Sequence, residues 1–186
     1  MKLFLYICAV VFALILLRYL IVIVKRAVLL AKIGKAAKKS GDRLIFARCR
    51  FSSVFVHDLR TDFILEKSGE RYEVAILTTP FKRFRYHFTS KERLKIVMLR
   101  RGVMMSNPRT PRSPSATVDR AFTVWRYKIS LPESDVPPER AILLIHPAPR
   151  ELLVTNKTAI DAPSNGEVIF GRFTVCFGKY FREHYI

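Results

Sequence analysis

The sequence predicts an α+β protein, in which a single N-terminal transmembrane helix precedes a small cytosolic domain with a mainly antiparallel sheet. Three observations predict this class. Residues 3–24 are apolar apart from one charge, Arg18. Several lysines and arginines follow this run, and the first acidic residue is Asp42. Further along, short segments rich in β-branched and aromatic residues are separated by turn signals, as expected for strands and hairpins.

The apolar run has the length of a membrane span. A helix of 22 residues extends roughly 33 Å, and a hydrocarbon core is about 30 Å thick. A cleaved signal peptide is a poorer interpretation, because Lys25 and Arg26 follow the run where a small-residue cleavage site is expected. Arg18 lies within about two turns of the end of the run and can extend its charge to the headgroups. We therefore expect a single-pass protein of the cell membrane.

The charges after the run predict its orientation. Cations next to a spanning helix stay on the cytoplasmic side, so the domain that follows should face the cytoplasm. We divide the chain into an anchor at 1–24, a basic amphipathic juxtamembrane segment at 25–43 and an α+β domain at 44–186. Apolar residues alternate with lysines in 25–39, which favours a helix that lies on the membrane or on the domain.

The domain contains one clear hairpin signal and several further strand signals. Residues 62–67 and 71–77 are β-prone and flank a Gly-containing break at Ser68-Gly69-Glu70. Residues 82–88 alternate strictly between aromatic and basic side chains, which predicts a half-buried strand with a cationic outer face. The segment 44–57 suits either a helix or a strand, and 173–185 could form a closing helix. Residues 106–117 hold three prolines among Arg, Ser and Thr and predict an exposed loop.

The net charge of +18 calls for an anionic partner. Anionic lipid headgroups attract each nearby cation by about 1 kcal/mol, and nucleic acid is the alternative partner. The three cysteines have no C-x-x-C spacing and indicate neither a disulfide framework nor a zinc site. The residues that we expect to bind the anionic partner lie just after the anchor and in the basic block that follows Phe81: Lys25, Arg26, Lys35, Lys38, Lys39, Lys82, Arg83, Arg85, Arg100 and Arg101.

One arrangement of carboxylates is a candidate for metal chemistry. Asp62 opens the first strand of the predicted hairpin, and Glu73 lies in the second. A helix followed by an Asp and then Glu-x-Lys on a hairpin resembles the PD-(D/E)xK restriction-endonuclease-like family. The resemblance implies that Asp62 and Glu73 converge on Mg²⁺, which activates a water molecule. Ala75 stands where the family has its water-positioning Lys, so the resemblance is to a degenerate member.

These observations favour a function without catalysis, although they do not decide whether the chain is an enzyme. We expect a membrane-anchored binding or scaffolding module, with no cofactor, whose basic surface contacts anionic lipid. The alternative is a degenerate restriction-endonuclease-like domain that binds nucleic acid, and Mg²⁺ belongs only to that alternative.

Overall fold

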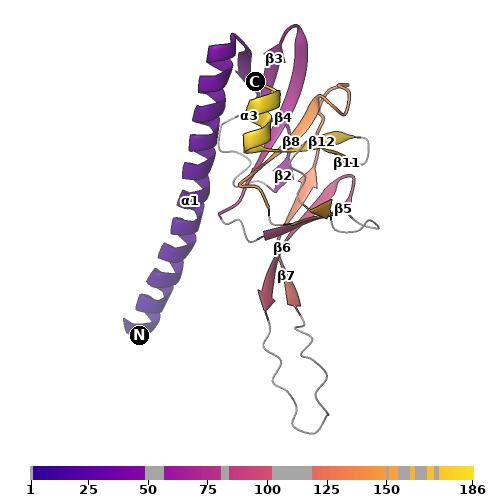
Figure 1. The fold of residues 1–186 in the computed structure, drawn as a ribbon. Coiled ribbons are helices and arrows are strands. Elements are labelled where there is room, and N and C mark those ends of the chain that lie inside the picture. Colours follow the sequence, from indigo (N-terminus) through magenta and orange to yellow (C-terminus); the bar gives the residue numbers. More distant parts are fainter. Residues whose placement is uncertain are drawn as a thin grey trace, which may run out of the picture.

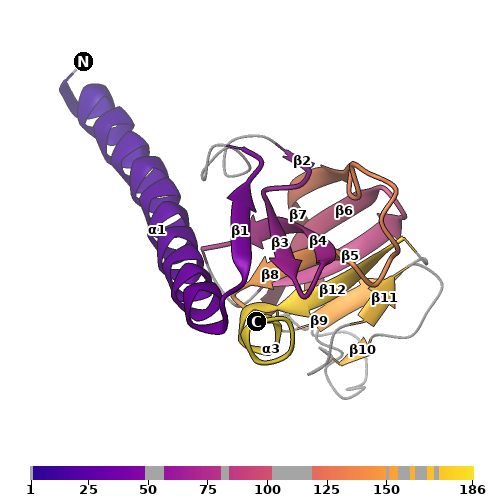
Figure 2. The ribbon, with the colours of Figure 1, turned by 90° about the horizontal axis from the view of Figure 1, so that it is seen from above.

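The computed structural model arranges the chain in three layers. Two helices cover one face of a six-stranded sheet, and a second six-stranded sheet covers its other face (Figures 1 and 2). The structure describes residues 2–48, 57–80, 84–101, 119–149, 151–154, 160–161, 167–169 and 172–186. The predicted loop at 106–117 lies outside these ranges. The expected α+β class with mainly antiparallel pairing is confirmed.

Helix α1 (Lys2–Ser40) runs without interruption through the expected boundary between anchor and juxtamembrane segment. Its first part carries apolar side chains on all sides, and residues 3–17 are exposed. Its second part packs on the domain through Leu29, Leu30, Ile33 and Ala37, all buried. The helix ends in a Schellman motif, in which Gly41 has a φ of +79° and the Asp42 N–H donates to the Ala37 carbonyl at 2.9 Å.

We call the sheet that contacts the helices sheet A. Its strands, in spatial order, are β1 (Arg43–Phe46), β3 (Phe63–Lys67), β4 (Glu70–Thr78), β8 (Ala141–His146), β12 (Phe173–Phe177) and β11 (Glu167–Ile169). The pairs β4–β8 and β8–β12 are parallel, and the other three pairs are antiparallel. The expected hairpin at 62–77 is therefore present as β3 and β4, with Lys67 paired to Glu70.

Two residues make the hairpin turn. Ser68 and Gly69 have φ values of 51° and 82°, as a type I′ turn requires at its two central positions. The twist of this turn matches that of the flanking strands, so the short sequence Ser68-Gly69 is enough to set the register of β3 on β4.

The second sheet, sheet B, has the spatial order β10 (Ile160–Asp161), β9 (Glu151–Val154), β5 (Phe84–Ser90), β6 (Arg93–Arg101), β7 (Asp119–Ile129) and β2 (Asp58–Leu59). Strands β5, β6 and β7 pair antiparallel in sequence order, whereas the β5–β9 and β2–β7 pairs are parallel. Over the described residues, six of the ten strand pairs in the two sheets are antiparallel.

Sheet A separates two apolar cores. Successive residues of β4 and β8 point to opposite faces, so Ile76 and Leu144 face the helices while Ala75 and Leu143 face sheet B. Helix α3 (Gly178–His184) follows β12 directly and packs beside α1, where Phe181 is fully buried. The expected closing helix over 173–185 is thus a strand followed by a short helix. The segment 44–57 was expected to be either a helix or a strand. Its first residues form a strand, because they belong to β1 (Arg43–Phe46).

Candidate functional site

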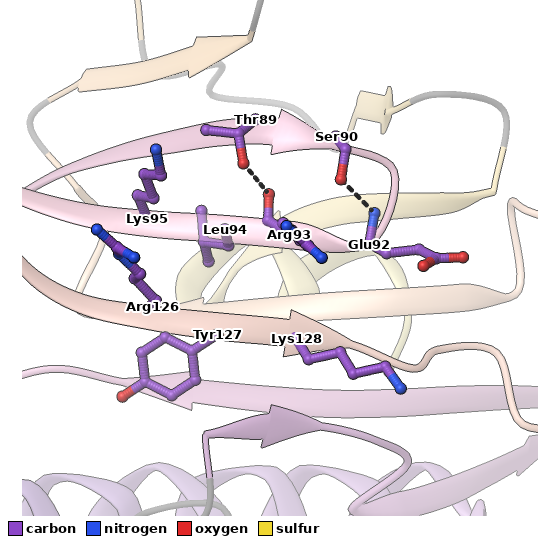
Figure 3. Close-up of a pocket in the computed structure, with 9 residues that line it drawn as sticks. All are labelled: Thr89, Ser90, Glu92, Arg93, Leu94, Lys95, Arg126, Tyr127 and Lys128. Carbon is purple, nitrogen blue, oxygen red and sulfur yellow. Dashed lines mark hydrogen bonds between the residues drawn. The ribbon is translucent and has the colours of Figure 1, made fainter.

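The outer face of sheet B carries a group of four cations on two neighbouring strands (Figure 3). Leu94 and Ile96 of β6 are buried in the core between the sheets, so Arg93 and Lys95 face outward. The same alternation turns Arg126 and Lys128 of β7 outward, beside buried Tyr127. We call Arg93, Lys95, Arg126 and Lys128 the basic cluster.

The register of the sheet brings like charges together. Lys95 pairs with Arg126, and Arg93 pairs with Lys128. Like charges directly opposite each other on two strands destabilise a sheet. Within the described part of the chain, none of the four lies within 4.0 Å of a carboxylate oxygen in an ion pair. An anion bound over the basic cluster would therefore reduce the repulsion between its four charges.

Hydroxyl groups and one acid complete the lining of the hollow beside the basic cluster, whose volume is about 960 Å³. The Thr89 hydroxyl donates to the Arg93 carbonyl at 3.3 Å, and the Ser90 hydroxyl accepts from the Glu92 N–H at 3.3 Å (Figure 3). Glu92 itself pairs with Arg172 at 3.0 Å. The hollow is thus open and cationic, and the one carboxylate in its lining is already paired.

The carboxylate of Asp58 lies near the basic cluster, because β2 pairs with β7 at Lys128. Burial opposes ionisation of Asp58, but a hydrogen bond from Ser130, contacts with Arg60 and the charge of Lys128 outweigh it, so the pKa of Asp58 is lowered. The binding residues predicted from the sequence include none of the four cations of the basic cluster, although Arg93 and Lys95 lie within the predicted basic block. The alternation of 125–129, in which Arg and Lys occupy every second position, is the signal that could have found Arg126 and Lys128.

The structure confirms the predicted two faces of β5. Phe84, Tyr86 and Phe88 are buried in the core between the sheets, whereas Arg85 and His87 are partly exposed on the other side. Of the other candidates in this block, Lys82 and Arg83 lie outside the described residues. Arg100 and Arg101 end β6, where the structure describes their backbone.

The candidate cations of α1 fall into two groups. Lys35, Lys38 and Lys39 are exposed, and Lys25 donates to the Pro80 carbonyl. Arg26 differs, and its assignment to the anion-binding surface is wrong. Its side chain is 1% exposed and donates to Asp62 at 2.7 Å, because the packing of α1 on sheet A turns this position inward.

The Arg26–Asp62 pair joins α1 to the backbone of sheet A. Arg26 Nη1 donates to the Ile76 carbonyl at 2.9 Å, while Asp62 Oδ2 accepts from the Ile76 N–H at 2.6 Å. Asp62 directly precedes β3, so its side chain reaches the edge of the β4 backbone that the hairpin leaves open. Both charged groups are therefore hydrogen-bonded, as buried ions require.

Glu73 has a different environment. Its carboxylate accepts from the Thr61 hydroxyl at 3.1 Å, the Glu133 N–H at 2.9 Å and the Ser134 hydroxyl. Arg71 Nη2 lies 3.5 Å from Glu73 Oε1. Burial opposes ionisation, but these hydrogen bonds outweigh it and hold the pKa of Glu73 below its ordinary value.

The structure does not bring Asp62 and Glu73 together. Val74 faces the helices and Ala75 faces sheet B, so Glu73 lies on the sheet B side, whereas Asp62 contacts α1 on the opposite side. Within the described ranges, no three His, Cys, Asp or Glu side chains are grouped as metal ligands. Ala75 is fully buried between the sheets.

Comparison with protein-family models, with curated proteins and with solved structures finds no match to this chain. The resemblance to the restriction-endonuclease-like family therefore stays a prediction from the sequence. The class that the structure defines is an α+β domain preceded by one helix that is long and apolar enough to cross a membrane, with a mean hydropathy of 3.0 over 18 residues.

Proposed function

We propose that the protein is a membrane-anchored binding module, without catalytic activity, that holds a basic domain against the anionic lipid of the cytoplasmic leaflet. The observation that carries this proposal is the division of α1 into two unlike halves. The first half is apolar and exposed, and the second half is packed on sheet A. The helix is thus both the anchor and a structural part of the domain.

The exposed half needs an apolar environment. Large side chains such as Leu3, Phe12 and Leu16 are 74%, 61% and 52% exposed. Apolar surface gains about 25 cal/mol per Å² when it leaves water, and a bilayer core provides that gain over the whole circumference of the helix. The packed half joins the domain to the anchor through Arg26, Leu29 and Ile33, which contact sheet A.

Two features support contact between the domain and the lipid. The far end of the β6–β7 hairpin projects in the same general direction as the N-terminal half of α1 (Figure 1). That end includes Arg100 and Arg101 on β6, paired with 119–120 on β7. The basic cluster lies nearer the other end of the same two strands, next to Trp125, which contacts Arg18 of α1.

The exposed lysines of α1 support the cytoplasmic orientation rather than the lipid contact. From Lys25 to Lys38 the helix rises about 20 Å, at 1.5 Å per residue. Charge interactions in physiological salt are screened over about 8 Å. If α1 is upright, Lys35, Lys38 and Lys39 therefore lie too far from the lipid surface to be strongly attracted to it. As cations that follow the span, they still favour the orientation in which the domain is cytoplasmic.

The experiment uses the full chain. A reporter fused after Ile186 should behave as cytoplasmic, and the protein should resist carbonate extraction. In nanodiscs, amides in 93–101 and 119–128 should exchange hydrogen more slowly over anionic than over zwitterionic lipid, and high salt should remove this protection. The variant Lys95→Gln with Arg126→Gln should lose it, whereas Lys38→Gln with Lys39→Gln should not.

Equal exchange over both kinds of lipid, or release by carbonate, would contradict the proposal. Single-stranded DNA is added over zwitterionic nanodiscs as a competing partner. Stronger protection of the same amides by DNA than by anionic lipid would favour the nucleic-acid alternative.

A further inference from the structure

A small cavity lies between α1 and the edge of the two sheets. Its volume is about 110 Å³, and its polar lining comes from Arg18, Tyr19, His57, Thr78, Trp125 and Tyr127. We propose that this cavity binds the headgroup phosphate of one anionic phospholipid, with Arg18 as its principal ligand. The inference rests on the membrane anchoring proposed above and adds a specific lipid site to it.

The cavity lies where the environment of α1 changes. Ile15 is 48% exposed, and Val22, two turns further on, is 7% exposed. Both residues line the cavity. The headgroup region of a bilayer should meet the helix at this change, and Tyr and Trp side chains concentrate at that depth. Tyr19, Trp125 and Tyr127 supply such aromatic side chains around the cavity.

Arg18 is placed to bind an anion. Its guanidinium carbon lies 4.0 Å from the centre of the Trp125 ring, so the ring covers one face of the planar group. The five N–H donors lie in the plane and are directed away from the ring contact, in a geometry that matches two oxygens of a phosphate. Within the described residues Arg18 forms no ion pair, and the lining of the cavity contains no carboxylate.

Thr78 provides a second and independent observation. It is 8% exposed, and its hydroxyl has no hydrogen-bond partner among the described residues. A buried hydroxyl without a partner is costly, and Thr78 lines the same cavity as Arg18. The hydroxyl oxygen itself has almost no accessible surface, so the side chain must rotate before a phosphate oxygen can accept its proton.

Tyr127 offers a further donor. Burial, together with the nearby Tyr19, raises the pKa of Tyr127 to about 12, although Arg18 lowers it, so the hydroxyl stays protonated at neutral pH. His57 stacks on the Tyr127 ring with 5.0 Å between centroids, and its Nδ1 lies 3.1 Å from the Arg126 carbonyl. These contacts hold the Tyr127 ring in place at the wall of the cavity.

Size and surroundings favour a lipid over a soluble anion. At about 30 Å³ for each water, the cavity has the room of three to four waters, which suits a phosphate group. Exposed apolar side chains of α1, among them Leu14 and Leu17, continue from the cavity along the anchor. They offer a surface for the acyl chains of the same lipid molecule.

The test is native mass spectrometry of the full chain released from nanodiscs with equal parts of phosphatidylglycerol and phosphatidylcholine. The wild type should retain one phosphatidylglycerol in preference to phosphatidylcholine, which carries the same phosphate but adds a cation that the Arg18 guanidinium repels. Arg18→Gln should lower this preference at least tenfold, and Thr78→Val, of nearly the same shape, about threefold. Lys38→Gln removes the same charge from an exposed position of α1 that the proposed function places away from the lipid. Lys38 does not line this cavity, so this variant should retain the wild-type preference.

Other outcomes overturn the inference. Equal retention of the two lipids by the wild type, or an unchanged preference in both Arg18→Gln and Thr78→Val, would show that the cavity does not select the headgroup. If millimolar inorganic phosphate displaces the lipid from the wild type, the cavity is a site for free phosphate. A protein that carbonate releases from membranes refutes the anchoring itself, whereas one that stays in the membrane without lipid preference refutes this inference alone.

Discussion

Replacing Asp62 with Ala should destabilise the domain far more than removing a surface charge. The substitution leaves the Arg26 guanidinium, 1% exposed, without its charge partner, and takes away the acceptor of the Ile76 N–H. Removing one partner of a buried ion pair costs about 3–5 kcal/mol, against a total stability of about 5–15 kcal/mol. At a urea dependence of about 2 kcal/mol per molar, the unfolding midpoint should fall by about 2 M.

The assay is urea unfolding of the full chain in detergent, followed by the fluorescence of Trp125, the single tryptophan. Glu183→Ala is the matched control, because it breaks the exposed pair with Lys179 and should cost less than about 1 kcal/mol. Arg26→Met combined with Asp62→Ala should be less destabilising than the sum of the two single changes. A loss below about 1 kcal/mol for Asp62→Ala, or strict additivity, would refute the role assigned to this pair.

Three further predictions concern pH, thiol chemistry and cleavage. The pKa of Glu73 is lowered in the folded state, so the unfolded chain binds more protons below the ordinary value of 4.5. Stability should therefore fall as the pH drops from that value through the folded pKa. The variant Glu73→Gln should show a smaller fall. If the urea midpoint depends on pH in the same way in the wild type and in Glu73→Gln, this prediction is wrong. Burial raises the pKa of the Cys176 thiol to about 12, so in a chain with Cys8 and Cys49 replaced by Ser, thiol reagents should label it only on unfolding; labelling as fast as a free thiol would count against that burial. Because Ala75 lacks the water-positioning cation, the protein should not cut DNA or RNA with Mg²⁺ or Mn²⁺. Cutting that Glu73→Gln abolishes, in a variant that stays folded, would show that the chain is an active nuclease.

The sequence was informative wherever a pattern is local. The long N-terminal helix could be predicted, because its length and apolarity, which make it able to cross a bilayer, are properties of one continuous run of residues. The faces of β5 followed from strict alternation, since neighbouring side chains of a strand point to opposite sides. The β3–β4 hairpin followed from a Gly-containing break between two β-prone runs, and the structure places its two-residue turn at Ser68-Gly69.

The sequence was less informative about segments that meet from far apart. The basic cluster depends on the pairing of β6 with β7, across a connection whose length says nothing about register. The parallel pairs β4–β8 and β8–β12 require the chain to cross between the two sheets. A mainly antiparallel sheet could be expected from the turns, but a pair of stacked sheets could not.

Arg26 shows most clearly what each level decides. By itself the sequence determined that a basic residue follows the apolar run. It did not determine whether that residue is exposed or buried. Only the packing of α1 on sheet A placed this side chain beside Asp62, 36 residues further along the chain, and left Lys35, Lys38 and Lys39 exposed. The physical reason is that burial is set by which face of a helix meets the sheet, and that choice depends on the fit of all the apolar side chains between them.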